Sequence, residues 1–289
     1  MKNVYTIAGL SKQAFFQYKE RKQKDAIYYE LLLIKADEIR MVHPKMGARK
    51  MYEMLIPEHI GRDKFESLLL QNGYRVCYSP NYIRTTYSVK CYQYINLIKG
   101  IELTGVNHVW QSDITYIWVS NKFYYLVFII DVYSRRIIGY NASNSLEATS
   151  NIKALEMAFC KRGREKYKGL IHHSDRGSQY ASDAYTNLLK LKGCEISMCD
   201  VAYENAYAER VNGIIKNEYL RCKNITNFCA LEKELDCAVN AYNYGRPHLS
   251  LVNKLSPANF EKYVLSLNAE ERPKVKLYTD GQKQEVNHE

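Results

Sequence analysis

The chain has 289 residues, with 41 Lys and Arg against 31 Asp and Glu, which gives a formal net charge of +10. Hydrophobic residues make up 46% of the chain and charged residues 25%, so a disordered protein is excluded and one or two globular domains are expected. No apolar run approaches the ~18 residues of a membrane-spanning helix, and the first residues lack the apolar core of a signal peptide, so a cytoplasmic protein with no membrane partner is expected.

The eight cysteines form no C-x-x-C pair. In a cytoplasmic protein they are expected to be reduced, small buried residues of the core. Their spacing does not predict a zinc site.

The excess positive charge lies in the first third of the chain. Residues 1–100 contain 17 Lys and Arg and 9 Asp and Glu, a net of +8, whereas residues 101–289 contain 24 and 22, a net of +2. Eleven of the 26 tyrosines also lie in residues 1–100. A basic segment with interleaved aromatic residues favours binding to nucleic acid, and the alternative is a solvated surface that keeps the protein soluble.

The N-terminal segment predicts two short helical pieces around a turn. In residues 4–23, Gly9 permits the turn and Ser11 is a suitable N-cap for the second piece. This pattern is a weak indication of a helix-turn-helix over residues 1–24.

Three further helices are predicted before residue 75, at 25–42, 47–56 and 62–72. Their basic outer faces resemble a small DNA-binding module, with Arg49 and Lys50 as candidate DNA contacts, and an ordinary helical subdomain is the alternative. A Tyr-rich connector follows at 76–100, so residues 25–100 are interpreted as a basic DNA-binding region and connector.

The pattern after residue 100 predicts an α/β fold. Strands are expected at 109–119, 123–132, 136–142, 169–173 and 195–198, and helices at 146–160, 183–192, 205–220 and 230–242. This order predicts a mixed five-stranded sheet flanked by helices, within a domain at 101–265. Residues 266–289 are expected to form a polar, loose tail.

Asp113 lies in the middle of the first strand. Alternation places it on one face with Gln111 and Thr115. An acid at such a position is disfavoured unless it has a partner or a chemical task, and a hydrogen-bonded structural Asp is the alternative.

Asp175 and Glu209 are the two other candidate acids. Asp175 directly follows a buried strand, where sites of α/β folds tend to lie, although turn-forming Asp residues are also common there. Glu209 shares one side of its helix with Asn212, Gly213 and Lys216, a side that suits a phosphate chain, and a solvated Glu is the alternative. If the three acids converge, their oxygen atoms suit a pair of Mg²⁺ ions.

Five motifs occur in a fixed order along the chain, and their residues are Trp110-Gln111-Ser112-Asp113-Ile114-Thr115-Tyr116-Ile117, Asp131-x-x-Ser134-Arg135, His173-Ser174-Asp175-Arg176-Gly177-Ser178-Gln179-Tyr180, Glu204-Asn205-Ala206-x-x-Glu209 and Tyr242-Asn243-x-x-Arg246-Pro247-His248. Together they resemble the integrase-type catalytic core of insertion-sequence transposases, specifically the second-reading-frame protein of the IS-three group. The resemblance covers about residues 105–262. It extends to residues 8–12 and to His43–Lys50, where Met46 replaces a family Tyr and Lys50 a family Arg.

The resemblance implies a ribonuclease-H-like fold with an Asp-Asp-Glu triad. By motif, Asp113, Asp175 and Glu209 are both the catalytic and the metal-binding residues, with Mg²⁺ or Mn²⁺, as two ions, for cofactors. The implied activity is metal-dependent cutting of element ends and their joining to target DNA by a DNA 3′-hydroxyl, without a covalent protein–DNA intermediate. The implied partners are DNA, further copies of the chain and the product of an upstream reading frame.

The remaining site residues are DNA-contact candidates and supporting residues. The candidate DNA contacts in this domain are Arg176, Asn212, Lys216 and Arg246, and the supporting residues are His173 and Asn205. A surface charge is the alternative for Lys216, and a packed histidine at a strand end is the alternative for His173.

The chain departs from the family pattern at two places. Glu204 stands where the family has Asp. The gap from Asp175 to Glu209, 209 − 175 = 34, is about two residues shorter than usual, which leaves Asp200 as a rival third acid. Two other functions remain open: a catalytically silent DNA-binding regulator, and a nuclease that cuts DNA without joining it.

Overall fold

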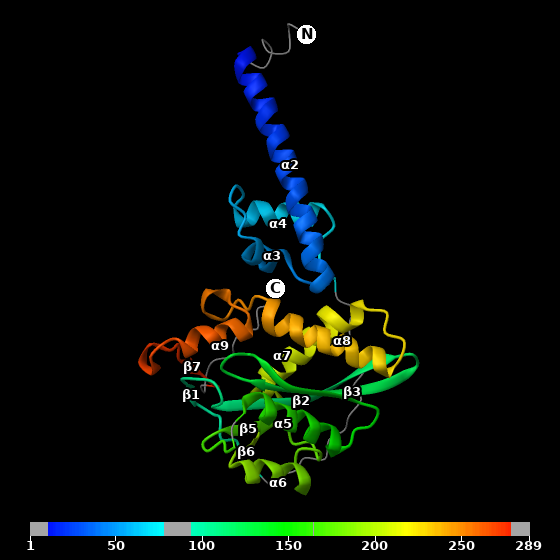
Figure 1. Cartoon of the computed structure of the whole chain (residues 1–289), viewed down its shortest axis with the longest axis vertical. Coiled ribbons are helices and arrows are strands. Elements are labelled where there is room, and N and C mark those ends of the chain that lie inside the picture. Colours follow the sequence, from blue (N-terminus) through cyan, green and yellow to red (C-terminus); the bar gives the residue numbers. More distant parts are fainter. Residues whose placement is uncertain (1–10, 78–93, 164, 279–289) are drawn as a thin grey trace. The chain divides into compact units, whose positions relative to one another are not determined.

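The computed structural model describes residues 11–77, 94–163 and 165–278 (Figure 1). The chain divides into two compact units, Met1–Cys77 and Tyr78–Glu289. Within the described residues, no helix has both the length and the apolar character needed to cross a membrane.

The first unit contains three helices, α2 (Lys12–Val42), α3 (Ala48–Leu55) and α4 (Arg62–Gln71). Ser11 is the N-cap of α2, as predicted, and its hydroxyl accepts a hydrogen bond from the amide of Ala14 at 3.1 Å. The interruption that we expected near residue 24 is wrong, because no Gly or Pro lies there to end the helix. The boundary that we placed after residue 24 therefore falls inside α2.

The predicted turn at Gly9 lies outside the described residues, so the helix-turn-helix remains a prediction. The core of the first unit lies between α3, α4 and the C-terminal half of α2. Met46, which replaces a family Tyr, is buried there beside Met51 and Phe65.

The second unit is built on a five-stranded mixed sheet, as predicted. Its strands are β2 (Val109–Val119), β3 (Lys122–Asp131), β4 (Ile137–Ser143), β5 (Ile171–Ser174) and β6 (Glu195–Met198). They lie in the order β4-β3-β2-β5-β6, with β2, β3 and β4 antiparallel and β5 and β6 parallel to β2. This is the ribonuclease-H-like arrangement that the resemblance implies.

Helices cover both faces of this sheet (Figure 1). On one face, α5 (Ala148–Arg162) and α6 (Asp183–Lys192) enclose an apolar core around Trp110. The other face carries α7 (Ala206–Ile214) and α8 (Phe228–Asn240), with a second apolar core. Gly139 lets α5 approach closely, because a Cβ atom there would lie 2.1 Å from the carbonyl oxygen of Ala154.

The helix predicted at 205–220 is α7 followed by a π-helical turn, Ile215–Tyr219. The prediction missed α9 (Pro257–Leu265) and the pairing of β1 (Glu102–Leu103) with β7 (Val275–Lys276). Because β7 is paired and Leu277 is fully buried, the expectation of a loose tail is wrong for this part of the chain.

A buried ionic network joins β3, α5 and α9. The Arg162 guanidinium lies 3.1 Å from a carboxylate oxygen of Asp131 and 2.6 Å from one of Glu261. Asp131 also accepts hydrogen bonds from the amides of Tyr133 and Ser134, which fixes the turn after β3. Arg136 completes the network by donating to Glu261 at 2.5 Å.

Candidate active site

The face of β2 that carries Asp113 is turned towards α7. The Asn212 side-chain amide donates to Asp113 Oδ2 at 2.8 Å, and Lys216 Nζ donates to Thr115 Oγ1 at 3.0 Å. Gln111, on the same face, donates to the carbonyl oxygen of Glu204 at 2.9 Å. These contacts confirm the face that alternation predicts for Gln111, Asp113 and Thr115.

The register of the sheet brings Asp113 and Asp175 to neighbouring positions. Ser112 on β2 pairs with Ser174, the last residue of β5; Asp113 is the next residue of β2, and Asp175 directly follows β5. Adjacent strands lie about 4.8 Å apart, so the two carboxylates start from adjacent backbone positions. Asp175 Oδ1 accepts a hydrogen bond from the amide of Gly177 at 3.0 Å, which orients this carboxylate.

Glu209 lies on the exposed surface of α7, one turn before Asn212. Burial raises the pKa of Glu209, and the charge of Asp175 raises it further. The pKa of Asp113 is raised well above its usual range by burial and then by the charges of Asp175 and Glu209. The three acids therefore lie in a common electrostatic field.

The chemistry of this group fits a divalent cation, which would relieve the repulsion between the carboxylates. Asn212 Oδ1 adds a buried oxygen atom that has no hydrogen-bond partner in the described part of the chain. Within residues 11–77, 94–163 and 165–278, however, no three Asp, Glu, His or Cys side chains are gathered tightly enough to form a metal site. The three acids therefore influence one another electrostatically, but their side chains do not converge into a metal-binding cluster in this structure.

His173 and Asn205 are both buried beside this face. His173 Nδ1 lies 2.8 Å from the Ser197 hydroxyl, and burial lowers the pKa of His173 to about 3, so its ring is neutral at pH 7. The Asn205 side chain donates to the carbonyl oxygen of Ser112 at 3.1 Å. Asn205 thus connects the start of α7 to β2 directly beside Asp113.

Glu204 and Asp200 have different environments. Glu204 is buried, and its carboxylate accepts hydrogen bonds from the amides of Asp200 and Val201, so it caps the shortened loop. Asp200 is exposed and forms ion pairs with Lys99, at 2.7 Å, and with Arg176. The Asp200 carboxylate is therefore directed towards Lys99 and Arg176 rather than towards the other acids.

The structure places most candidate DNA contacts against other protein groups. Arg246 is only 3% exposed, and its guanidinium binds both carboxylate oxygens of Glu218, so its contact with DNA stays a prediction. Lys216 is 8% exposed and also lies over the ring of Tyr116. Arg176 pairs with Asp200, as described above. Each of these side chains therefore has a partner within the protein.

In the first unit, Arg49 and Lys50 lie on α3. Arg49 is exposed, and its Nε lies 3.2 Å from a carboxylate oxygen of Glu66. Lys50 is half-buried.

Sequence reasoning missed the two contacts between β2 and α7. It assigned Asn212 and Lys216 to DNA, whereas the structure pairs them with Asp113 and Thr115. The spacing of these residues could have indicated the pairing. The four residues from Asn212 to Lys216 advance about 6 Å along a helix, and the two from Asp113 to Thr115 advance about 6.8 Å along a strand. Polar residues at matching steps can therefore pair along the two elements.

The raised pKa values predict that Asp113 destabilises the metal-free protein. The unfolded chain loses this proton near pH 3.9, whereas the folded protein retains it to higher pH, so the free energy of unfolding falls as pH rises above about 4. At pH 7 without divalent ions, Asp113→Asn is expected to be more stable than wild type by about 1–3 kcal/mol. Thermal unfolding should show a midpoint higher by about 2–4 °C per kcal/mol.

The same experiment with Mg²⁺ provides the control. Wild type is expected to gain stability from Mg²⁺ binding, by about 2.7 kcal/mol at one hundred times the dissociation constant, and Asp113→Asn is expected to gain much less. Near pH 3, where the carboxylates are protonated in both states, the two proteins should unfold at similar temperatures. A wild type that is the more stable of the two at pH 7 without metal would contradict the raised pKa.

Two family profiles match the second unit. Both are described as "Integrase core domain", and they match residues 104–203 and 193–257. Similar solved structures include the simian T-cell lymphotropic virus intasome in complex with the PP2A regulatory subunit B56 gamma, with a TM-score of 0.47 and 17% identity over 75% of this chain and 70% of that one. The HTLV-2 integrase catalytic core domain in complex with magnesium has a TM-score of 0.44 and 19% identity over 57% and 99% of the two chains.

The chain is also similar to curated proteins of insertion sequences. The transposase of element IS629 from Shigella sonnei is 32% identical over 225 residues, which cover 76% of this chain and 75% of that protein. The 31 kDa protein of element IS600 from Shigella sonnei is 32% identical over 89% of this chain and 97% of its own length. Transposase InsF of IS3A from Escherichia coli is 34% identical over 55% of each chain. The chain therefore belongs to the insertion-sequence transposases of the IS3 type, which are polynucleotidyl transferases with an integrase core domain.

Proposed function

We propose that Asp113, Asp175 and Glu209 are the catalytic triad of this transposase, and that they hold the divalent metal ions needed to cut element ends and join them to target DNA. The observation that carries the proposal is the pairing of Ser112 with Ser174, since Asp113 follows Ser112 on β2 and Asp175 follows Ser174 at the end of β5. The charge of Glu209 acts on the pKa of Asp113, which supports its place in the same group.

The protein's own groups orient the three acids. The Asn212 amide holds one oxygen of Asp113, and the amide of Gly177 holds one oxygen of Asp175. Glu209 approaches from the exposed side of α7, where a DNA strand has access. A bound pair of Mg²⁺ or Mn²⁺ ions would supply activation of the attacking hydroxyl and stabilisation of the leaving oxygen.

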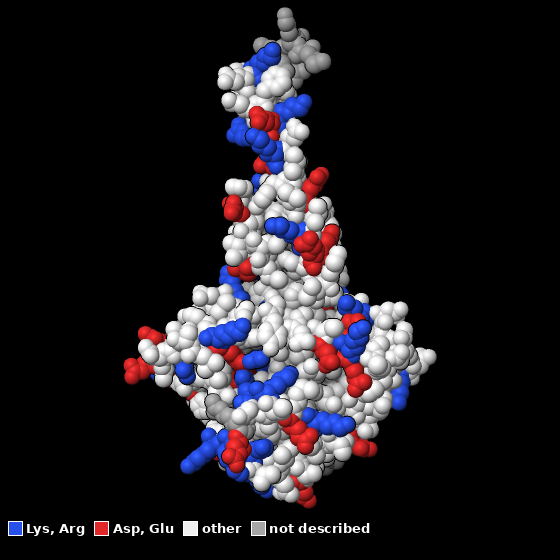
Figure 2. Space-filling model, in the orientation of Figure 1, with Lys and Arg blue, Asp and Glu red and all other residues white. Residues whose placement is uncertain are grey.

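DNA is the proposed partner of both units. The first unit carries exposed Arg49 and half-buried Lys50, and Figure 2 shows positive and negative side chains interspersed on the displayed face rather than a patch of one sign. DNA binding is therefore proposed to use individual basic groups. The other proposed partners are further copies of the chain and the product of an upstream reading frame. The proposed location is the bacterial cytoplasm, with the protein at the nucleoid when it is bound to DNA.

Purified protein incubated with Mg²⁺ and labelled element ends tests this proposal. We expect cleaved ends and products joined to target DNA, and we expect Glu209→Gln to form neither. Cleavage without joined products would identify a nuclease, and DNA binding without cleavage would identify a regulator. Full activity of Glu209→Gln would remove Glu209 from the triad.

A further inference from the structure

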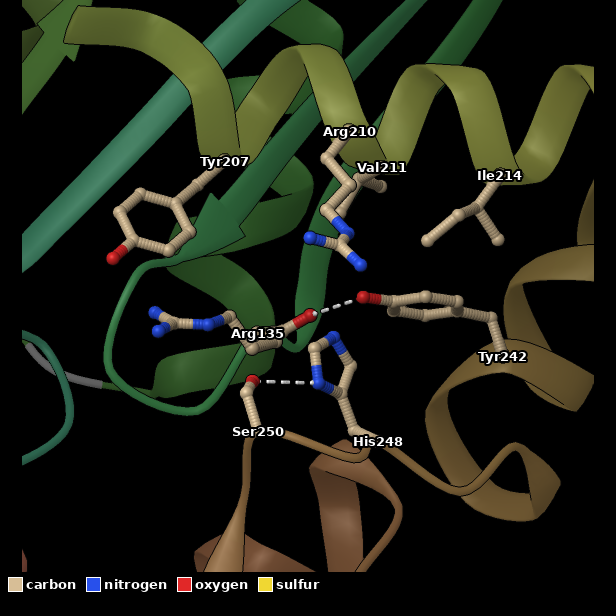
Figure 3. Close-up of a pocket in the computed structure, with 8 residues that line it drawn as sticks. All are labelled: Arg135, Tyr207, Arg210, Val211, Ile214, Tyr242, His248 and Ser250. Atoms are coloured by element: carbon tan, nitrogen blue, oxygen red, sulfur yellow. Dashed lines mark hydrogen bonds between the residues drawn. The ribbon is translucent and has the colours of Figure 1, made fainter. Parts of the chain in front are cut away.

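The second unit contains a cavity on another side of α7. It has a volume of about 40 Å³, is partly open to solvent, and is formed by the β3–β4 turn, α7 and the segment after α8 (Figure 3). Its polar lining consists of Arg135, Tyr207, Arg210, Tyr242, His248 and Ser250, and the remaining lining residues are aliphatic. None of the residues that line it is acidic, so the cavity has a positive character.

Arg135 is held in this cavity without an acidic partner. Its backbone has a positive φ of 65°, and its carbonyl oxygen accepts a hydrogen bond from the Tyr242 hydroxyl at 3.1 Å. The guanidinium carbon lies 4.0 Å from the centre of the Tyr207 ring, and Nη1 is buried with no hydrogen-bond partner among the described residues. Asp131, which acts on Arg135 electrostatically, is already paired with Arg162.

Arg135 is only 7% exposed, and a buried Nη1 without an acceptor is uncommon, because such a donor costs about 1–3 kcal/mol. An anion in the cavity would supply the missing acceptor. Burial lowers the pKa of Arg135 from its usual value, but arginine remains charged at pH 7.

Further donors line the same space. Arg210 is exposed on α7 and forms no ion pair with any described residue, and Figure 3 shows its guanidinium extending towards His248 and the main-chain carbonyl of Arg135, whose own guanidinium lies beside Tyr207. The Ser250 hydroxyl lies 3.0 Å from His248 Nδ1, so these two side chains support each other at the edge of the cavity. Two guanidinium groups and a hydroxyl match the several acceptor oxygens of a phosphate group.

The position of the cavity relates it to the acids. Arg210 directly follows Glu209 on α7, so the two side chains lie on adjacent sides of one helix. A helix with its side chains is about 10–12 Å across. Successive nucleotides of one strand rise about 3.4 Å, so a strand at the acids has phosphates within reach of the cavity about three nucleotides away.

We propose that this cavity is a phosphate subsite, in which Arg135 and Arg210 bind a backbone phosphate of the DNA strand that enters the active site. This inference rests on the proposed function, because that function supplies DNA as the ligand. A free phosphate anion has the same chemistry, and the experiment below separates the two sources.

Equilibrium binding of the full chain to element-end DNA, measured from low to high salt without divalent ions, tests the subsite. Arg210→Ala is expected to weaken binding to every sequence and to reduce the slope of log affinity against log salt by about 1, the change for one lost phosphate contact. The matched control is Lys233→Ala, which removes one exposed positive charge on α8. Arg135→Lys keeps the positive charge but loses the planar guanidinium, so it should weaken binding and leave the slope close to that of wild type.

Inorganic phosphate alone is the second probe. It should raise the thermal unfolding midpoint of wild type and Lys233→Ala but not that of Arg210→Ala. Equal salt slopes for Arg210→Ala and Lys233→Ala would overturn the proposal, even if phosphate alone binds, because the occupant would then be a free anion. Because these readouts need no catalysis, a reduced slope in a protein that never cleaves DNA supports the subsite and refutes only the proposed function.

Discussion

Asp175→Asn is expected to lose both cleavage and strand transfer by at least about 10³-fold, the scale on which loss of a single catalytic group acts in other enzymes. The replacement keeps the oxygen that accepts the Gly177 amide, so the loop should retain its conformation. It removes the negative charge that Asp175 contributes beside Asp113. Strand-transfer assays at saturating Mg²⁺ measure the loss, and binding of element ends should be unchanged.

Asp200→Asn is the matched control for this prediction. It neutralises an acid in the same region, but Asp200 is exposed and paired with Lys99 and Arg176. Loss of exposed ion pairs costs about 0–1 kcal/mol, so this variant should fold and keep most of its activity. If Asp200→Asn were inactive and Asp175→Asn active, the assignment of the triad would be wrong.

Arg162→Met is expected to destabilise the second unit by about 3–5 kcal/mol, because it leaves the buried carboxylates of Asp131 and Glu261 without their shared cation. Burial by itself would raise the pKa of Glu261, but the hydrogen bonds and charge of Arg162 hold that pKa below its usual value. Denaturant unfolding at pH 7 measures the loss.

The pH dependence separates lost charge pairing from lost packing. Without Arg162, the pKa values of Asp131 and Glu261 should rise, so the variant should recover part of its stability as pH falls towards 4–5 and the carboxylates take up protons. Arg136→Met provides the control, since Arg136 is more exposed and its loss leaves the contacts of Arg162 in place. A loss below about 1 kcal/mol for Arg162→Met would refute a structural role for the network.

The hydrophobic pattern of the second unit was sufficient to predict its five-stranded sheet and the face of β2 that carries Asp113. A strand has a side-chain period of two, so a polar set at Gln111, Asp113 and Thr115 must share a face. The register between β2 and β5 could not be predicted, because it depends on contacts between segments about 60 residues apart. That register, not the alternation, makes Asp175 a neighbour of Asp113.

Charge alone did not show which basic residues of the second unit pair within the protein. Arg246 is a candidate DNA contact by its motif, and its partner Glu218 lies 28 residues away in the sequence. Lys216 binds Thr115 across 101 residues. A sequence shows that a side chain is charged but not whether a distant segment of the chain satisfies it, so surface assignments of this kind require tertiary structure.

The pairing of β1 with β7 has a consequence for the architecture of the second unit. Glu102 pairs with Lys276, so the first and last strands among the described residues of this unit lie side by side (Figure 1). A unit with adjacent ends is topologically close to a ring, and such units tolerate circular permutation and insertion into other proteins. The part of the second unit between β1 and β7 can therefore be regarded as a module whose entry and exit lie together.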